Sequence, residues 1–138
     1  MSLTPESEAI LARLAASVED LQWHSETDAP FELLYWPGTV GKQLAPADVL
    51  KLVGLESDTP LEVLAVEAFF APALTPQDWH TPVEVEETQR FQALQRLLSE
   101  TLTQLQVYRC GEIELEIYIT GQLPTGEWAV LHTSAVET

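Results

Sequence analysis

Alternating apolar and polar side chains along residues 111–119 place the strongest constraint on what this chain can fold into. The aliphatic residues fall on every second position and acidic or aromatic residues fall between them: Ile113, Leu115, Ile117 and Ile119, against Glu112, Glu114, Glu116 and Tyr118. Successive side chains of a strand point to opposite faces, so this period predicts a strand with one buried and one solvated face. Residues 121–126 predict a turn into a last strand over residues 128–133, which completes an antiparallel hairpin.

Helix start signals predict three helices. Thr4-Pro5, followed by apolar residues at helical spacing, predicts a helix over residues 5–21. Thr81-Pro82-Val83-Glu84 is a capping box and predicts the longest helix, over residues 82–105. Ala45-Pro46-Ala47-Asp48 predicts a short helix that ends near Gly54.

Two further strands are predicted over residues 31–36 and 61–66, which are rich in apolar and aromatic residues. The predicted order is helix, strand, helix, strand, helix, hairpin. This order favours one α+β domain over residues 1–138, with a mainly antiparallel four-stranded sheet and helices packed on it.

The composition is that of a globular protein, with 46% apolar and 20% charged residues in 138. No apolar run approaches the ~20 residues of a membrane span. The first ten residues have neither the basic nor the apolar region of a signal peptide. We therefore expect a soluble cytoplasmic protein without membrane contact.

The net charge of −16, from 6 basic and 22 acidic residues, excludes whole classes of ligand. On the surface of a chain this size it amounts to roughly one negative charge per 450 Å². Such a field repels nucleic acids, anionic membranes and phosphorylated substrates, and it attracts basic proteins and cations. Acidity for solubility alone is the alternative interpretation.

The sequence offers no motif for catalysis or metal binding. His24, His80 and His132 have no metal-ligand spacing, and no phosphate-binding glycine loop is present. Cys110 is the only cysteine, which excludes an intrachain disulfide and is typical of a buried packing residue. We expect a protein that is not an enzyme.

Three glutamates on alternate positions, Glu112, Glu114 and Glu116, form a predicted row of carboxylates. Alternate residues of a strand stand about 6.7 Å apart, comparable to successive phosphates of a nucleic-acid strand. The row therefore suggests a DNA mimic. The alternative is an ordinary solvated face of a sheet.

Several segments taken together resemble the nuclease A inhibitor family, whose members bind and block a sugar-non-specific, metal-dependent endonuclease. They are Ser25-Glu26, Pro30-Phe31-Glu32, Thr75-Pro76-Gln77-Asp78-Trp79, Val107-Tyr108-Arg109, Gly111-Glu112-Ile113-Glu114-Leu115, Pro124 with Gly126, and Val136-Glu137-Thr138. These segments follow the family's order across nearly the whole chain, whereas residues 37–60 and His80 match the family poorly. The resemblance implies an α-β-α sandwich of PR-1-like fold around an antiparallel sheet.

The resemblance also implies how the protein acts. The hydroxyl of the last threonine, here Thr138, takes a coordination position on the catalytic Mg²⁺ of the nuclease. A glutamate after the first helix, here Glu26, stands in for the scissile phosphate. An Asp-Trp pair, here Asp78 and Trp79, makes a second contact. The metal is the partner's, so the chain itself is expected to have no cofactor.

Each of these residues also has a structural interpretation. Glu26 fits an ordinary loop carboxylate. Asp78 follows Thr75 by three residues, which is a capping-box spacing. Trp79, beside a helix start, fits a half-buried core position, and a terminal residue such as Thr138 is commonly frayed.

The resemblance favours a protein inhibitor that is a monomer when free and forms a 1:1 complex with its nuclease. The alternative is an acidic protein-binding module of the same fold that engages another basic partner without inhibiting a nuclease. Loss of DNA hydrolysis at a near-stoichiometric ratio distinguishes the two.

Overall fold

The computed structural model describes residues 4–24, 28–36, 44–56, 58–74 and 81–136. The helices within these residues are α1 (Pro5–Val18), α2 (Pro46–Leu52), α3 (Val66–Leu74) and α4 (Pro82–Thr101). The strands are β1 (Gln22–His24), β2 (Asp28–Pro30), β3 (Glu32–Trp36), β4 (Leu61–Leu64), β5 (Thr103–Cys110), β6 (Glu114–Gln122) and β7 (Trp128–Val136).

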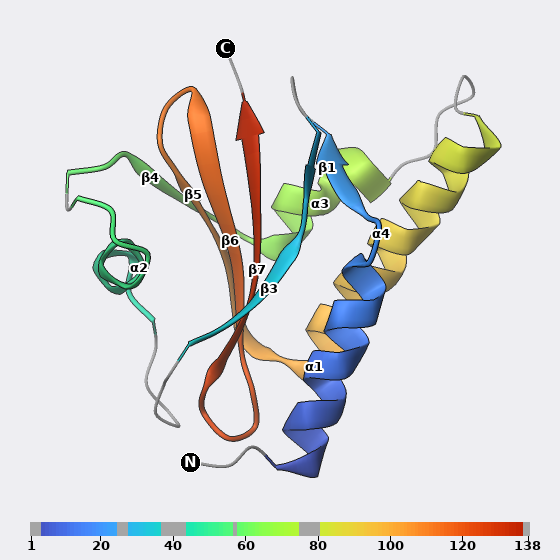
Figure 1. The fold of residues 1–138 in the computed structure, drawn as a ribbon, viewed down its shortest axis with the longest axis horizontal. Coiled ribbons are helices and arrows are strands. Elements are labelled where there is room, and N and C mark those ends of the chain that lie inside the picture. The colour runs from blue at the N-terminus through green and yellow to red at the C-terminus, as the bar shows by residue number, and fades with distance from the viewer. Residues whose placement is uncertain (1–3, 25–27, 37–43, 57, 75–80, 137–138) are drawn as a thin grey trace.

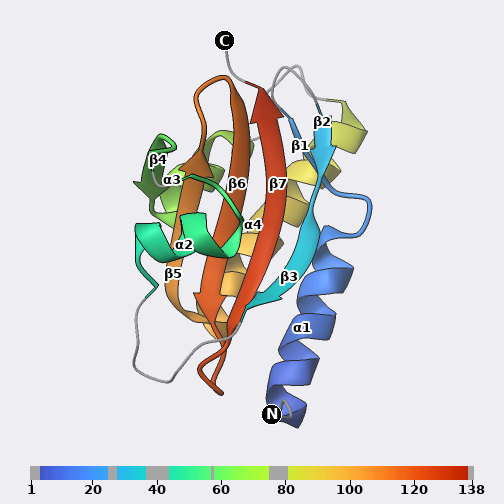
Figure 2. The ribbon, with the colours of Figure 1, turned by 60° about the vertical axis from the view of Figure 1, so that its left-hand side comes forward.

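One antiparallel sheet forms the middle layer, with its strands in the order β3-β7-β6-β5-β4 (Figure 1). Helices α1, α3 and α4 lie on one face of this sheet, and α2 lies on the other (Figures 1 and 2). The architecture is therefore the expected α+β single domain, an α-β-α sandwich. The sheet has five strands rather than the four predicted.

The β6–β7 hairpin confirms the strongest sequence signal. Its register runs from Gln122↔Trp128 at the turn to Glu114↔Val136 at the open end. The amide of Leu123 donates to the carbonyl of Glu127 at 2.8 Å and closes the turn. The two strands extend to Gln122 and Val136, each three residues beyond the predicted ends at 119 and 133.

The additional strand of the main sheet is β5, which begins where the longest helix was expected to continue. Helix α4 ends at Thr101 rather than near 105. Leu102 is buried and Leu105 is partly buried against the core that α4 also covers. Because both residues continue the apolar spacing of α4, the sequence pattern also fitted a longer helix. Gln104 has φ +53, and the register shifts between Thr103 and Gln106. Pairing with β6 thus overrides a helical pattern of apolar residues.

The predicted strand over residues 61–66 is shorter, and a helix follows it. Strand β4 ends at Leu64, and α3 contains Phe69 and Phe70, both buried. A short apolar run does not by itself distinguish a buried helix from a strand. The small β1–β2 sheet was likewise not predicted.

The helix starts were predicted well. The Thr4 side chain accepts a hydrogen bond from the Ser7 amide at 3.2 Å. Thr81 and Glu84 form the expected reciprocal capping box. The Asp48 carboxylate accepts from the Ala45 amide at 3.1 Å at the start of α2. Helix α1 ends at Val18, three residues before the predicted end.

Two apolar clusters fill the spaces on either side of the sheet, which corrects the prediction of a solvated face. Ile117 and Ile119 point into the larger cluster, beneath α1, α3 and α4. Tyr118, expected on the solvated face, is 6% exposed and lies in the smaller cluster with Val49 and Leu50 of α2. The second face of β6 is therefore covered in part by α2. No helix in the described ranges is long and apolar enough to cross a membrane.

Candidate functional site

The four predicted contact residues, Glu26, Asp78, Trp79 and Thr138, lie outside the described residues, as does the proposed Thr75–Asp78 capping box. The described elements on either side of them define the framework of the candidate site. These elements are the β1–β2 hairpin, the end of α3, the start of α4 and the end of β7.

The β1–β2 hairpin brackets residues 25–27. Its antiparallel register pairs Trp23 with Ala29 and His24 with Asp28. The Thr133 hydroxyl of β7 donates to the carbonyl of Ala29 at 3.3 Å, in a buried hydrogen bond. The hairpin is therefore attached to the last strand of the main sheet.

A cluster of aromatic rings attaches the same hairpin to α3 and α4. The Trp23 ring stacks on Phe69 of α3, with centroids 4.3 Å apart. Its edge contacts Phe91 of α4 at a centroid distance of 5.8 Å. Such pairs contribute about 0.5–1.5 kcal/mol each beyond the area they bury. Helices α3 and α4 bracket residues 75–80, so one tryptophan connects the flanks of both predicted contact segments.

The start of α4 is fixed immediately after residues 75–80. The Glu84 amide donates to the Thr81 hydroxyl oxygen at 3.3 Å, and the carboxylate of Glu84 accepts from the Thr81 amide. Pro82 at the first helical position has the backbone angle that a helix requires. The chain therefore enters α4 in a defined direction.

The described part of β7 ends at Val136, which pairs with Glu114 of β6. The end of β7, the β1–β2 hairpin and the first turn of α4 all lie at the same end of the molecule (Figures 1 and 2). The β6–β7 turn and the start of α1 lie at the opposite end. The fold thus gathers the neighbours of all four predicted residues, although they are spread over the whole sequence.

The three predicted carboxylates do not form one row along a strand. Glu112 lies in the turn before β6, and only Glu114 and Glu116 belong to the strand. A carboxylate oxygen of Glu116 is 2.5 Å from Nε2 of His132, and Nδ1 of the same ring is 3.3 Å from Glu32. His132 therefore connects strands β3, β7 and β6, a role that its isolated position in the sequence did not reveal.

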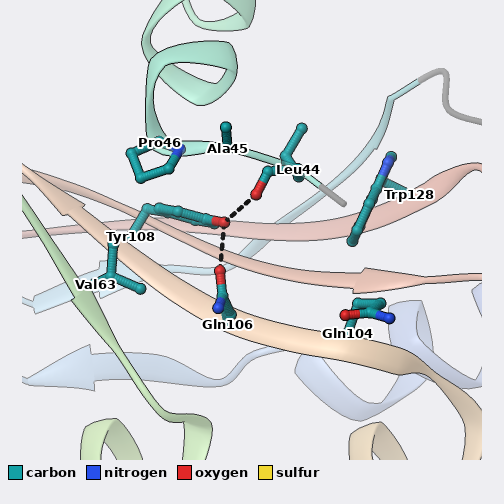
Figure 3. Close-up of a pocket in the computed structure, with 8 residues that line it drawn as sticks. All are labelled: Leu44, Ala45, Pro46, Val63, Gln104, Gln106, Tyr108 and Trp128. Carbon is teal, nitrogen blue, oxygen red and sulfur yellow. Dashed lines mark hydrogen bonds between the residues drawn. The ribbon is translucent and has the colours of Figure 1, made fainter. Parts of the chain in front are cut away.

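A cavity of about 320 Å³ lies between α2 and the sheet (Figure 3). Leu44, Val63, Trp128 and the side chain of Gln106 contribute to its lining. The Tyr108 hydroxyl lies within hydrogen-bonding distance of the Leu44 carbonyl and of Oε1 of Gln106, at 3.0 and 2.6 Å. Burial, and then the charge of Asp48, raise the pKa of Tyr108. The raised pKa keeps the Tyr108 hydroxyl protonated at neutral pH, so this group is not a general base there.

The other perturbed groups near this face are also held in their neutral forms. Burial, and then the charge of Glu116, raise the pKa of Cys110 to about 11. Burial is also the main cause that raises the pKa of Tyr118 to about 12. Within the ranges that the structure describes, no cluster of histidine, cysteine or acidic residues is arranged to hold a metal ion.

A family model described as "Nuclease A inhibitor-like protein" matches residues 8–138. No curated protein matches the chain significantly. The matched range begins inside α1, ends at the last residue of the sequence, and includes every element of the candidate site.

Proposed function

Because the chain belongs to the nuclease A inhibitor-like family, we propose that it inhibits a sugar-non-specific, metal-dependent endonuclease by occupying the active site of that enzyme. Nuclease inhibition in general follows from the family. The kind of nuclease, the 1:1 stoichiometry and the residues in contact are our proposal. The match over residues 8–138, nearly the whole chain, is the observation that carries it.

In this proposal Glu26 replaces the scissile phosphate of the substrate. Its carboxylate is attracted by the same basic side chains that bind a phosphodiester, and it presents no bond that the nuclease can cleave. The β1–β2 hairpin on either side of residues 25–27 is held by Thr133 and by Trp23. Strands that are already held on either side lose little freedom of their own on binding.

Thr138 supplies an oxygen ligand to the Mg²⁺ of the nuclease. Mg²⁺ prefers oxygen ligands in octahedral geometry and usually keeps exchangeable waters, so a threonine hydroxyl can replace one of them. Asp78 and Trp79 supply a second contact beside α4. The chain itself needs no metal for this role.

The charge of the protein supports binding to a basic cleft. The net charge of −16 is spread over an accessible surface of 7,862 Å², about one charge per 490 Å². A field of this sign steers the protein towards a site built for phosphates and away from nucleic acids. We expect the inhibitor to act in the cytoplasm, where it protects the cell that makes the nuclease.

The test is a titration of the untagged protein against a nuclease of the ββα-metal type, with Mg²⁺ present, while plasmid degradation is followed. We expect hydrolysis to stop near an equimolar ratio. Undiminished hydrolysis at a tenfold excess would contradict the proposal. If the protein then retained another basic partner in a pull-down, the non-inhibitory binding module would be the better description.

A further inference from the structure

Ile113 is exposed although the alternating pattern of its segment predicts that it is buried. Its side chain is 55% exposed, whereas Leu115, the next member of the pattern, is 6% exposed. The difference arises because β6 begins at Glu114, and residues 111–113 form the turn between β5 and β6. Among the described residues only Val83, in the first turn of α4, is a more exposed large apolar residue.

The backbone of this turn is anchored at its first residue, Gly111. Gly111 has φ +114, and a Cβ at this position would lie 2.4 Å from the carbonyl oxygen of Glu114. The Gly111 amide donates to the Pro60 carbonyl at 2.8 Å. The first residue of the turn thus has a conformation that favours glycine, and its amide is bonded to the segment before β4. An apolar side chain on a fixed backbone loses little freedom when it is buried by a partner.

The turn lies beside the end of β7 that leads to Thr138. Glu114 and Val136 are paired across β6 and β7, and paired strands are about 4.8 Å apart. Both views place the β5–β6 turn at the same end of the molecule as the end of β7 (Figures 1 and 2). A partner that contacts the end of β7 at Val136 is therefore close to this turn as well.

The chemistry of the turn fits the rim of a phosphate-binding cleft. Ile113 stands between Glu112 and Glu114, and both carboxylates belong to exposed residues. Arginine and lysine have an apolar stem and a charged head. An isoleucine beside two carboxylates can bury the stem and pair with the head at once. A shallow hollow adjoins the turn, and its lining mixes the apolar Pro60, Leu61 and Leu115 with the charged Glu62, Arg109 and Glu112. Arg109 is paired with Glu62 at 3.2 Å.

We propose that the β5–β6 turn, residues 111–114, is a further contact surface for the nuclease, in which Ile113 packs on a basic side chain at the cleft rim. This inference rests on the proposed function. It adds a contact separate from Glu26, Asp78, Trp79 and Thr138. It also assigns a role to Glu112 and Glu114, which do not form a continuous row of carboxylates along a strand.

The test compares Ile113→Ser with Leu52→Ser by measuring the dissociation constant for a ββα-metal nuclease with Mg²⁺ present. Leu52 is the matched control, because it is an aliphatic residue 43% exposed on α2, away from the chain end. We expect Ile113→Ser to bind about tenfold more weakly and Leu52→Ser to bind like the native protein. The melting temperature of Ile113→Ser should stay within about 2 °C of the native value, since exposed substitutions change stability little.

The outcomes separate this inference from the proposed function. If the native protein inhibits and Ile113→Ser binds equally well, the contact is absent and the inhibitor function stands. If Ile113→Ser and Leu52→Ser weaken nuclease binding equally, Ile113 makes no specific contact and this inference is wrong. If the native protein neither binds nor inhibits the nuclease, the proposed function fails and this contact fails with it.

Discussion

At the scale of single residues, Thr138 and Glu26 are each assigned to one position of the nuclease complex. Deleting Thr138 should weaken inhibition because the hydroxyl ligand is lost. Extending the chain beyond Thr138 should also weaken it, because the added residues would meet the floor of the cleft and keep the hydroxyl from the metal. Thr138→Val tests the oxygen alone, and Glu26→Gln tests the charge alone. Each substitution should weaken nuclease binding by about 1–3 kcal/mol in a titration with Mg²⁺ present. Inhibition by the truncated and extended proteins at native strength would contradict active-site insertion.

Substitution of Trp79 distinguishes a role in the nuclease interface from a role in the protein core. Trp79→Ala should weaken nuclease binding by about 2–4 kcal/mol if the ring is a contact anchor. Its melting temperature should then match that of the native protein. A melting temperature that falls together with the affinity would place Trp79 in the core and exclude it as an anchor.

Cys110 should be chemically inert in the folded protein. Its side chain is 2% exposed, and burial raises its thiol pKa to about 11. A raised pKa keeps the thiol protonated at pH 8, and the thiolate is the form that reacts with disulfide reagents. We expect labelling by such a reagent at pH 8 only after denaturation. Rapid stoichiometric labelling of the native protein would show that this end of β5 is open to solvent.

At the scale of elements, the contribution of the Thr81 capping box to the stability of α4 can be measured. Thr81→Ala removes the acceptor for the Glu84 amide and should lower the free energy of unfolding by about 1 kcal/mol, measured by urea denaturation. Val83→Ala is the control in the same helical turn. Its side chain is 73% exposed, so its stability should stay within about 0.5 kcal/mol of native. Equal stability of the two variants would mean that the cap contributes little.

The elements around the candidate site depend on one another through a few side chains. Trp23 contacts Phe69 of α3 and Phe91 of α4, and the Thr133 hydroxyl binds the backbone of β2. Because rings in such a cluster share neighbours, a change in one is felt by the others. The hairpin, the two helices and β7 therefore act as one support for the proposed contact residues.

At the scale of the whole molecule, association should be electrostatically steered. The net charge of −16 attracts the basic cleft of a nuclease over distances set by the Debye length. That length shrinks from roughly 14 to 4 Å between about 50 and 500 mM salt. We expect the association rate, measured by stopped flow, to fall severalfold while the dissociation rate changes less. An association rate independent of salt would rule out steering.

The sequence by itself determined the features that depend on neighbouring residues. Thr4 and Thr81 mark the helix starts because their hydroxyls accept hydrogen bonds from amides three residues later. Residues 121–126 predicted the β6–β7 turn because glycine and proline favour turns, and the turn lies at residues 123–127. These signals act within a few residues of the chain. The candidate contact residues came from family resemblance rather than from local patterns, and they lie outside the described residues.

Only the tertiary structure decided which elements pair and which faces are covered. Leu102 and Leu105 fit a helical pattern, yet the chain leaves the helix at Leu102 because β5 finds β6 as a partner. Tyr118 has the spacing of a solvated residue, yet α2 covers it. Ile113 has the spacing of a buried residue, yet it projects from a turn. Strand pairing and helix packing join residues far apart in sequence, so their energies cannot be read from neighbouring residues. The same long-range contacts bring the β1–β2 hairpin, the first turn of α4 and the end of β7 to one end of the molecule.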